Sequence, residues 1–345
     1  MCNDDGVLQA QDVLTNARTA HPLRDLSHFI QAHDAAGLEV YMTNEQQRNN
    51  RALFEACRDG AEEICFVLIL FGADVNSAHN KYQETPLFIA CWHAHLACVN
   101  LLLENGSNVN SGDVFFGLTP LMATTSRASC ESSIQFGHRM DELFFDNRCR
   151  CMQSLLVFGA AIDHTDEGGW TALMHASWNF KLTEKLLEYG ANVNISSHLR
   201  WSVLYNVTNP RLNNANMIET IKLLLLVLAH GAEIDAQDLF GSTSLHLACD
   251  NLYNPAVVYT LLYDNADIDI MNCEYQTALQ CTMSHQSDSP NRVVVLHMMA
   301  TCAQHRLEAS SSDWIRLARN ERNGHQLALG STGTTQTTLG SICLV

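Results

Sequence analysis

The sequence predicts an all-α fold, a solenoid of stacked helix-turn-helix units joined by finger loops. Two short patterns predict it, and they alternate along most of the chain. One pattern opens each unit with Thr or Ser two residues before a Leu, at Thr85, Thr119, Thr171, Ser202, Thr243 and Thr277. The other closes each unit with a Gly-Ala-x-Val-Asn type of sequence, starting at Gly72, Gly106, Gly159, Gly190, Gly231 and Asn265.

The Thr slot is expected to start the first helix of each unit. A Thr or Ser side chain can accept a bond from a backbone N–H that has no partner within the helix. Pro86 and Pro120 follow directly, at a position where a missing N–H costs nothing. The second helix, as in residues 98–106 (CVNLLLENG), has apolar residues at helical spacing and ends on a Gly. Because one helix pair buries too little apolar surface to fold alone, neighbouring pairs must stack.

The spacing between the two patterns separates regular from irregular parts of the units. Each closing slot lies 12 or 13 residues before the next Thr slot, which predicts finger loops of nearly constant length. The distance from a Thr slot to its closing slot varies from 19 to 40 residues. We therefore expect an insertion of about 19 residues near 129–147 and one of about 8 near 209–215, both projecting away from the fingers.

The two ends of the chain differ from the repeats. Residues 1–46 contain a GLEV sequence at Gly37 that aligns with GADV at Gly72 and predict a degenerate N-terminal capping repeat, because a solenoid must cover its last apolar face. The repeat array is expected over 47–309, with residues 293–305 as its last second helix. Residues 310–345 predict a short helix and a flexible tail.

Both patterns closely resemble the ankyrin repeat, whose signature is T-P-L-H-x-A within about 33 residues. The resemblance covers roughly residues 47–300. It implies an ankyrin-repeat solenoid that binds a partner protein through its concave surface, as an intracellular scaffold or adaptor.

A second resemblance implies an alternative function. Thr338, Leu339 and Cys343, in the sequence TTLGSICL, resemble the opening of the elongin-binding box of SOCS-box ankyrin proteins. The fifth and sixth repeats also resemble those of Fem-1-like receptors. The alternative is a substrate receptor of a cullin-RING (elongin-type) E3 ubiquitin ligase.

Composition narrows the class of partner. The chain has 20 Lys and Arg against 37 Asp and Glu, a net charge of −17. Because phosphate binding depends on Lys and Arg, we expect no nucleic-acid and no membrane partner, but a protein with a basic surface. The 13 cysteines are scattered through apolar segments, which is typical of reduced, buried thiols. We expect a location in the cytoplasm or the nucleus, since the N-terminus lacks a signal-peptide pattern and no apolar stretch approaches the roughly 18 residues of a membrane span. We also expect a monomer.

Motifs for catalysis and metal binding are absent from the sequence. GxGxxG, GxxxxGK[ST], GxSxG and HExxH do not occur, so we predict no enzyme and no cofactor. Cys130, His138, Cys149 and Cys151 are residue types that bind zinc, but their spacing matches no zinc-site pattern. We predict no metal site, and a mobile or partner-binding loop instead.

Aromatic residues precede the Thr slots and are the candidate partner-binding residues. Stacked fingers should align them along one edge of the concave surface, where aromatic side chains are enriched in binding hot spots. The alternative is that each ring packs on the neighbouring finger and stiffens the array. Asp166 and Glu167 are candidates for an acidic rim. The aromatic candidates are Tyr82, Phe116, Trp170, Trp201, Phe240 and Tyr275.

Three asparagines are candidate modification sites. Asn76, Asn110 and Asn194 each end a G-x-x-V-N sequence and follow a Leu by eight residues. This pattern resembles the sites at which ankyrin asparagines are hydroxylated in animal cells.

Overall fold

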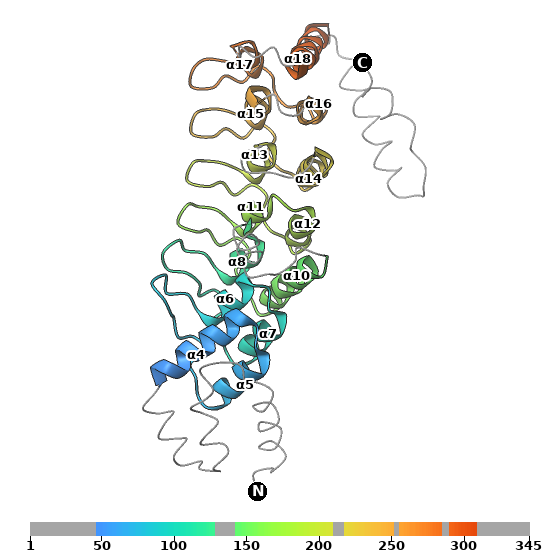
Figure 1. Ribbon diagram of the computed structural model, residues 1–345. Coiled ribbons are helices and arrows are strands. Elements are labelled where there is room, and N and C mark those ends of the chain that lie inside the picture. The colour runs from blue at the N-terminus through green and yellow to red at the C-terminus, as the bar shows by residue number, and fades with distance from the viewer. Residues whose placement is uncertain (1–45, 128–141, 210–216, 252–254, 285–289, 309–345) are drawn as a thin grey trace, which may run out of the picture.

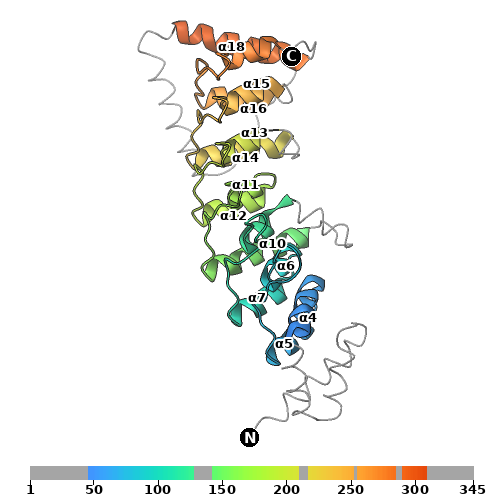
Figure 2. The ribbon, with the colours of Figure 1, turned by 90° about the vertical axis from the view of Figure 1, so that its left-hand side faces the viewer.

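A computed structural model of the chain describes residues 46–127, 142–209, 217–251, 255–284 and 290–308. Within these residues, helix pairs stack along one axis, with finger loops on one side and the second helices on the other (Figure 1). Figure 2, turned by 90°, shows the same order from α4 to α18. The described residues contain isolated β-bridges in the fingers and no strand. The predicted all-α solenoid is confirmed.

The first helices of the pairs form an inner row beside the fingers, and the second helices form an outer row. The inner row consists of α4 (Gln46–Asp59), α6 (Pro86–Trp92), α8 (Pro120–Thr125), α11 (Ala172–Ala176), α13 (Val203–Thr208), α15 (Ser244–Asn251) and α17 (Ala278–Ser284). The outer row consists of α5 (Glu62–Leu70), α7 (Leu96–Glu104), α10 (Glu142–Val157), α12 (Phe180–Glu188), α14 (Met217–Ala229), α16 (Pro255–Tyr263) and α18 (Pro290–Glu308).

The Thr slots start the inner helices, as predicted. Oγ1 of Thr85 accepts a hydrogen bond from the backbone N of Phe88 at 3.2 Å, and Pro86 occupies the first helical position. The other slots make the same bond three residues ahead, from Met122, Met174, Tyr205, His246 and Gln280. Each cap fixes where a finger ends and a helix begins.

Leucines of the Thr-led pattern form the inner layer of the core. These side chains are at most 1% exposed at Leu53, Leu87, Leu121, Leu173, Leu204 and Leu245. A matching row on the outer helices is fully buried at Leu68, Leu102, Leu155, Leu186, Val227 and Leu261. Because every repeat contributes to both rows, the core is continuous along the stack and holds the finger loops in register.

The first inner helix begins earlier than the others. Arg51 occupies the position of the Thr slot in this first repeat, two residues before Leu53. It lies inside α4, where its side chain pairs with Glu55 at 3.0 Å. A Thr at this position favours the start of a helix over its interior, because its side chain bonds to backbone N–H groups of the following turn. Arg favours the helix, and α4 therefore starts at Gln46.

Part of the predicted insertion near 129–147 belongs to a helix, which corrects the sequence-based boundary. α10 begins at Glu142, so residues 142–147 continue the outer row. Within α10 the buried guanidinium of Arg148 donates to the carbonyls of Ala123 (3.2 Å), Thr124 (2.5 Å) and Trp92 (3.0 Å). A cation at these helix carboxyl ends is electrostatically favourable. Several predicted segments lie outside the described residues. They are the rest of that insertion, the insertion near 209–215 except Asn209, the N-terminal cap except Gln46, and residues 310–345.

Candidate functional site

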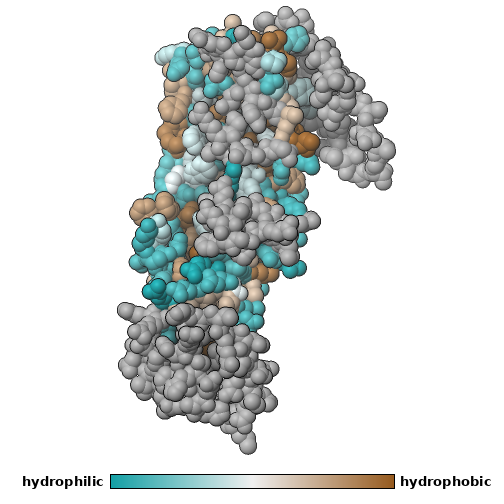
Figure 3. Space-filling model, in the orientation of Figure 1, coloured by the Kyte–Doolittle hydropathy of each residue, from teal (hydrophilic) through white to brown (hydrophobic). Residues whose placement is uncertain are grey.

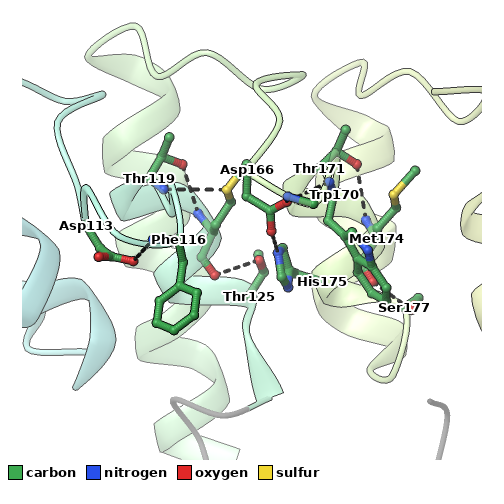
Figure 4. Close-up of polar contacts among 12 residues, drawn as sticks. Asp113, Phe116, Thr119, Thr125, Asp166, Trp170, Thr171, Met174, His175 and Ser177 are labelled. Atoms are coloured by element: carbon green, nitrogen blue, oxygen red, sulfur yellow. Dashed lines mark hydrogen bonds and ion pairs between the residues drawn. The ribbon is translucent and has the colours of Figure 1, made fainter. Parts of the chain in front are cut away.

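A short polar side chain shapes each finger by accepting bonds from its own turn. In the second finger the Asp113 carboxylate accepts from the backbone N of Phe115 (2.8 Å) and Phe116 (2.9 Å). In the third, Asp166 accepts from Gly168 and Trp170, both at 2.8 Å (Figure 4). Such side-chain bonds hold a turn without a sheet around it. The equivalent residues of the other fingers are Asn80, Ser197, Asp238 and Asn272.

Backbone hydrogen bonds join each finger to the next. Glu167 N donates to Phe116 O at 2.9 Å, and His198 N donates to Gly168 O at 3.0 Å. The first and second fingers are joined by Val114 N and Tyr82 O, at 3.1 Å. Leu239 N to Leu199 O (3.2 Å) and Cys273 N to Phe240 O (2.8 Å) complete the series. The fingers therefore form one ordered edge. Because the edge is ordered before a partner binds, binding costs the fingers little conformational entropy.

A left-handed residue two positions before each Thr slot separates the tip of the finger from its base. This residue is a glycine in three fingers, Gly117, Gly169 and Gly241, with φ between 70° and 77°. In the others it is Gln83, Arg200 and Tyr275, with φ of 58° or 59°. Residues before this position lie at the tip, and the residue after it turns back toward the inner helix.

The predicted aromatic row divides into two sets because its members occupy different positions. Trp170 and Trp201 stand one residue before the Thr or Ser slot, at the base of the finger, and both are partly buried. Their ring centroids lie 6.3 Å apart, edge to face. Trp201 also stacks on Tyr205 at 5.4 Å. Both rings therefore pack on neighbouring side chains, an arrangement that fits the alternative interpretation of the row.

The remaining aromatic candidates lie at finger tips. Phe116 and Phe240, three residues before their Thr slots, are 51% and 66% exposed, and Tyr275 is 83% exposed. Tyr82 is partly buried against Phe116, with ring centroids 6.3 Å apart. These four residues lie outside the core, so a partner can contact them without disturbing the packing of the helices.

Exposed apolar residues that the sequence interpretation overlooked surround these tips. The N-terminal tip cluster consists of Tyr82, Val114, Phe115 and Phe116. The C-terminal tip cluster consists of Leu199, Leu239, Phe240, Met271 and Tyr275. Figure 3 shows apolar surface in two places along the finger edge, with more polar surface between them. The available sequence signal was the run of apolar residues inside turns, where Gly, Asn, Asp and Ser are usual.

Asp166 serves the fold instead of forming an exposed rim. Its side chain is 10% exposed, and its Oδ2 accepts a hydrogen bond from Nε2 of His175 at 2.8 Å (Figure 4). Partial burial raises the pKa of Asp166, but the bonds from His175, Trp170 and Gly168 outweigh it and hold the pKa below its ordinary value. We therefore leave Asp166 out of the contact surface. Glu167, the neighbouring candidate, is exposed.

Acidic residues outnumber basic ones in the six loops between closing and Thr slots. These loops contain twelve Asp and Glu, against Lys81 and Arg200 as the only Lys or Arg. Part of this charge is structural, because Asp113, Asp166 and Asp238 accept bonds within their turns. The finger edge nevertheless carries an excess of negative charge.

The three candidate asparagines link neighbouring repeats. Asn76 donates from Nδ2 to Gly106 O at 3.2 Å, and its Oδ1 accepts from Asn108 N at 2.7 Å. Asn194 makes the same pair of bonds with the next repeat, and Asn110 accepts from Ala161 N. All three are exposed, while the leucines of the pattern, Leu68, Leu102 and Leu186, are fully buried.

The cysteines of the described residues show no sign of a reactive or metal-binding centre. Burial raises the pKa of Cys151 and of Cys249 to about 12, so neither supplies a thiolate at neutral pH. Among the described residues no group of His, Cys, Asp and Glu could hold a metal ion. Cys149 and Cys151, two residues apart on α10, point to different faces of that helix. Cys130 and His138 lie outside the described residues.

No helix in the described part of the chain has the length and apolar character needed to cross a bilayer.

Comparison with known proteins identifies the repeat. A family model of three consecutive ankyrin repeats matches residues 26–113, and a single ankyrin repeat model matches residues 168–198 and 240–273. B-cell lymphoma 3 protein homolog of Mus musculus is 29% identical over 232 residues, which cover 64% of this chain and 45% of that protein. Ankyrin repeat and SOCS box protein 6 of Homo sapiens is 26% identical over 205 residues, 54% of this chain and 44% of that protein.

A solved structure supports the same assignment. The human ASB11 ankyrin repeat domain superposes with a TM-score of 0.54 at 25% identity, covering 71% of this chain and 96% of that domain. The chain spans less than half the length of the two curated relatives. The matched models describe ankyrin repeats and indicate no catalytic family. The two sequence patterns, the stacked helix pairs and these matches together show that the chain contains ankyrin repeats, stacked as an all-α ankyrin solenoid.

Proposed function

We propose that the chain is a protein-interaction scaffold or adaptor that binds a partner protein along its finger edge. The observation that carries this proposal is the display of exposed apolar tips on fingers whose backbones are hydrogen-bonded to one another. Exposed apolar patches on an ordered surface are typical of protein-binding sites. Ankyrin repeats are interaction modules, and the family assignment supports the same function.

Charge supports a partner with a basic surface. The excess of Asp and Glu in the finger loops agrees in sign with the net charge of −17. Such a surface accelerates encounter with a positively charged partner and suppresses acidic ones. A monomer in the cytoplasm or nucleus is part of this proposal. Buried cysteine thiols such as Cys57 and Cys65, whose sulfur atoms lie 3.5 Å apart without a bond, support a reducing compartment.

The test compares the partner proteins that are recovered by the wild-type chain and by two variants of the full chain. The N-tip variant carries Val114→Ser, Phe115→Ser and Phe116→Ser. The control variant carries Val157→Ser, Ile218→Ser and Tyr263→Ser, which are equally exposed but lie on the outer row. Affinity purification with mass spectrometry identifies partners, and calorimetry measures their affinity. We expect the N-tip variant to lose about 2 kcal/mol or more of binding free energy and the control to lose little. Equal affinities of all three forms would place the binding site elsewhere.

A second candidate function is a substrate receptor of an elongin-type cullin-RING ubiquitin ligase. It is supported by the likeness to ankyrin repeat and SOCS box protein 6 and by Thr338, Leu339 and Cys343, which lie outside the described residues. Elongin and cullin should then copurify with the full chain and be lost on Leu339→Ser with Cys343→Ser. Recovery of other partner proteins without elongin and without cullin would argue for a scaffold that is not part of a ligase.

Hydroxylation of Asn76, Asn110 and Asn194 is a further part of the proposal. Their exposure supports access to the side chains, but the buried leucines of the pattern require that a repeat open before a modifying enzyme can read it. Peptide mass spectra of protein from animal cells should show added oxygen at these residues. Complete coverage of all three without oxidation would contradict the proposal.

A further inference from the structure

The structure points to a partner segment of a particular design: we propose that one continuous segment carries two apolar anchors, one for each tip cluster, with basic residues between them. The inference rests on the proposed function and specifies the partner. Its basis is the interruption of the apolar finger edge by one polar finger.

Each tip cluster is a preformed apolar contact. At the N-terminal cluster, Asp113 holds the turn of Phe115 and Phe116, and the two rings lie 4.8 Å apart, edge to face. Phe115 also contacts Tyr82 of the preceding finger, at 6.1 Å between ring centroids. The C-terminal cluster spans three fingers, with Leu239 bonded through its backbone to Leu199. Ring contacts thus order the N-terminal cluster, and backbone bonds between fingers hold the residues of the C-terminal cluster at fixed positions.

The third finger separates the two clusters. Its tip is formed by Thr165, Asp166, Glu167 and two glycines, and it presents no exposed large apolar side chain. Glu167 is exposed there, and its backbone N binds Phe116 O of the N-terminal cluster. Gly168 O, in the same tip, accepts from His198, next to Leu199 of the C-terminal cluster. Glu167 is therefore an exposed acidic residue on the finger between the two clusters, where a Lys or Arg of the partner can reach it.

The stack sets the separation of the anchors. Packed helices lie about 8–10 Å apart, so Phe116 and Phe240, three repeats from each other, are separated by about 24–30 Å. An extended chain advances about 3.3 Å per residue, so the second anchor must follow the first by about 7–9 positions. A segment whose anchors are fewer than about five positions apart can fill one cluster only, because even Leu199, two repeats from Phe116, lies about 16–20 Å away.

The probe is a phage library of random 16-residue linear peptides selected on the full chain. Selected peptides should carry two apolar groups with Lys or Arg between them. Fluorescence anisotropy then measures the best peptide against the N-tip variant and against a C-tip variant with Leu199→Ser, Leu239→Ser and Phe240→Ser. Each variant should bind about 30-fold more weakly or worse, while the outer-row control variant binds normally. Circular dichroism checks that all of these variants are folded.

Peptide length tests the two-anchor arrangement directly. Removing four residues between the anchors should reduce the affinity to the level of a single-anchor peptide, because the second anchor can no longer reach its cluster. Glu167→Lys should weaken binding about tenfold and flatten its salt dependence, whereas Glu104→Lys, an exposed charge change on α7, should not.

Three results would overturn the inference while leaving the proposed function standing. They are a best peptide that depends on one cluster only, an affinity independent of anchor separation, and a tip-dependent self-association in sedimentation that identifies a second copy as the occupant. A best peptide insensitive to both tip variants would overturn the inference and the finger-edge function together. Failure of the selection to yield any binder counts against the inference alone if the N-tip variant still loses a protein partner.

Discussion

The second and third fingers have the same backbone design and present opposite surfaces. In each, an aspartate holds the turn, a left-handed glycine follows, and a Thr caps the next helix. The second finger places Phe116 at its tip, whereas the third places Trp170 at its base and Glu167 at its tip. The difference teaches that the position of an aromatic residue relative to the left-handed turn decides whether it is exposed at the tip or packs inside the array.

The largest expected effect comes from replacing the base aromatic. Trp170→Ala should lower the free energy of unfolding by about 2–3 kcal/mol, because the partly buried ring packs against the core and Trp201. Phe116→Ala, at the exposed tip, should change it by less than about 0.5 kcal/mol. Urea unfolding followed by circular dichroism measures both. Similar losses for the two variants would contradict the division into base and tip residues.

Replacing the left-handed glycine should likewise destabilise the third finger, at Gly169, more than the second, at Gly117. Both have positive φ, so an alanine is strained at either position. A Cβ at Gly169 would also lie 2.7 Å from the backbone N of His198, whereas at Gly117 the nearest atom is Glu167 N at 3.1 Å. We expect Gly169→Ala to cost about 2 kcal/mol and Gly117→Ala about 1 kcal/mol. Denaturation midpoints decide the order, and a larger loss at Gly117 would show that the third finger is the less constrained.

Asp166 should give the third finger a distinct dependence on pH. Asp166→Asn should cost about 1 kcal/mol at pH 7, since Asn retains an acceptor but loses the charged bond to His175. Because the folded-state pKa of Asp166 is lowered, its contribution is complete above the unfolded-state pKa of about 4 and is lost as the pH falls through the folded-state value. The difference between wild type and variant should therefore shrink below about pH 4. A difference that stays constant from pH 3 to pH 7 would contradict the role of the charge.

The smallest effect is expected at the sixth finger. Tyr275 occupies the left-handed position that Gly fills in the second and third fingers, with φ of 58°. Tyr275→Gly should stabilise the fold by about 0.5 kcal/mol, because relief of backbone strain outweighs the added entropy of the unfolded chain. Thermal unfolding tests the direction. A lower midpoint would mean that the exposed ring contributes more to the fold than its environment indicates.

The repeat pattern was sufficient to predict the fold and the elements that hold the site. The Thr slots predicted helix starts, and the buried leucines follow from the same pattern. The candidate site was only partly predictable. Aromatic residues were grouped because they stand near the Thr slots, although Trp170 is one residue before its slot and Phe116 three. Counting from the slot would have separated them. The role of Arg148 could not be predicted from the sequence, because its carbonyl partners lie 24, 25 and 56 residues away in the chain.

Local chemistry explains what the sequence by itself determined about this protein: the stacked helix pairs, the constant finger length and the acidic character. Each arises from residues close together in the chain, since a cap, a turn and an apolar stripe act within one repeat. Only the tertiary structure decided which finger residues are exposed, which acids are used within turns, and where the apolar tips fall into two clusters. Exposure depends on the neighbouring finger. The backbone hydrogen bonds between neighbouring fingers join residues that are 30 to 51 positions apart in the sequence, from His198–Gly168 to Glu167–Phe116.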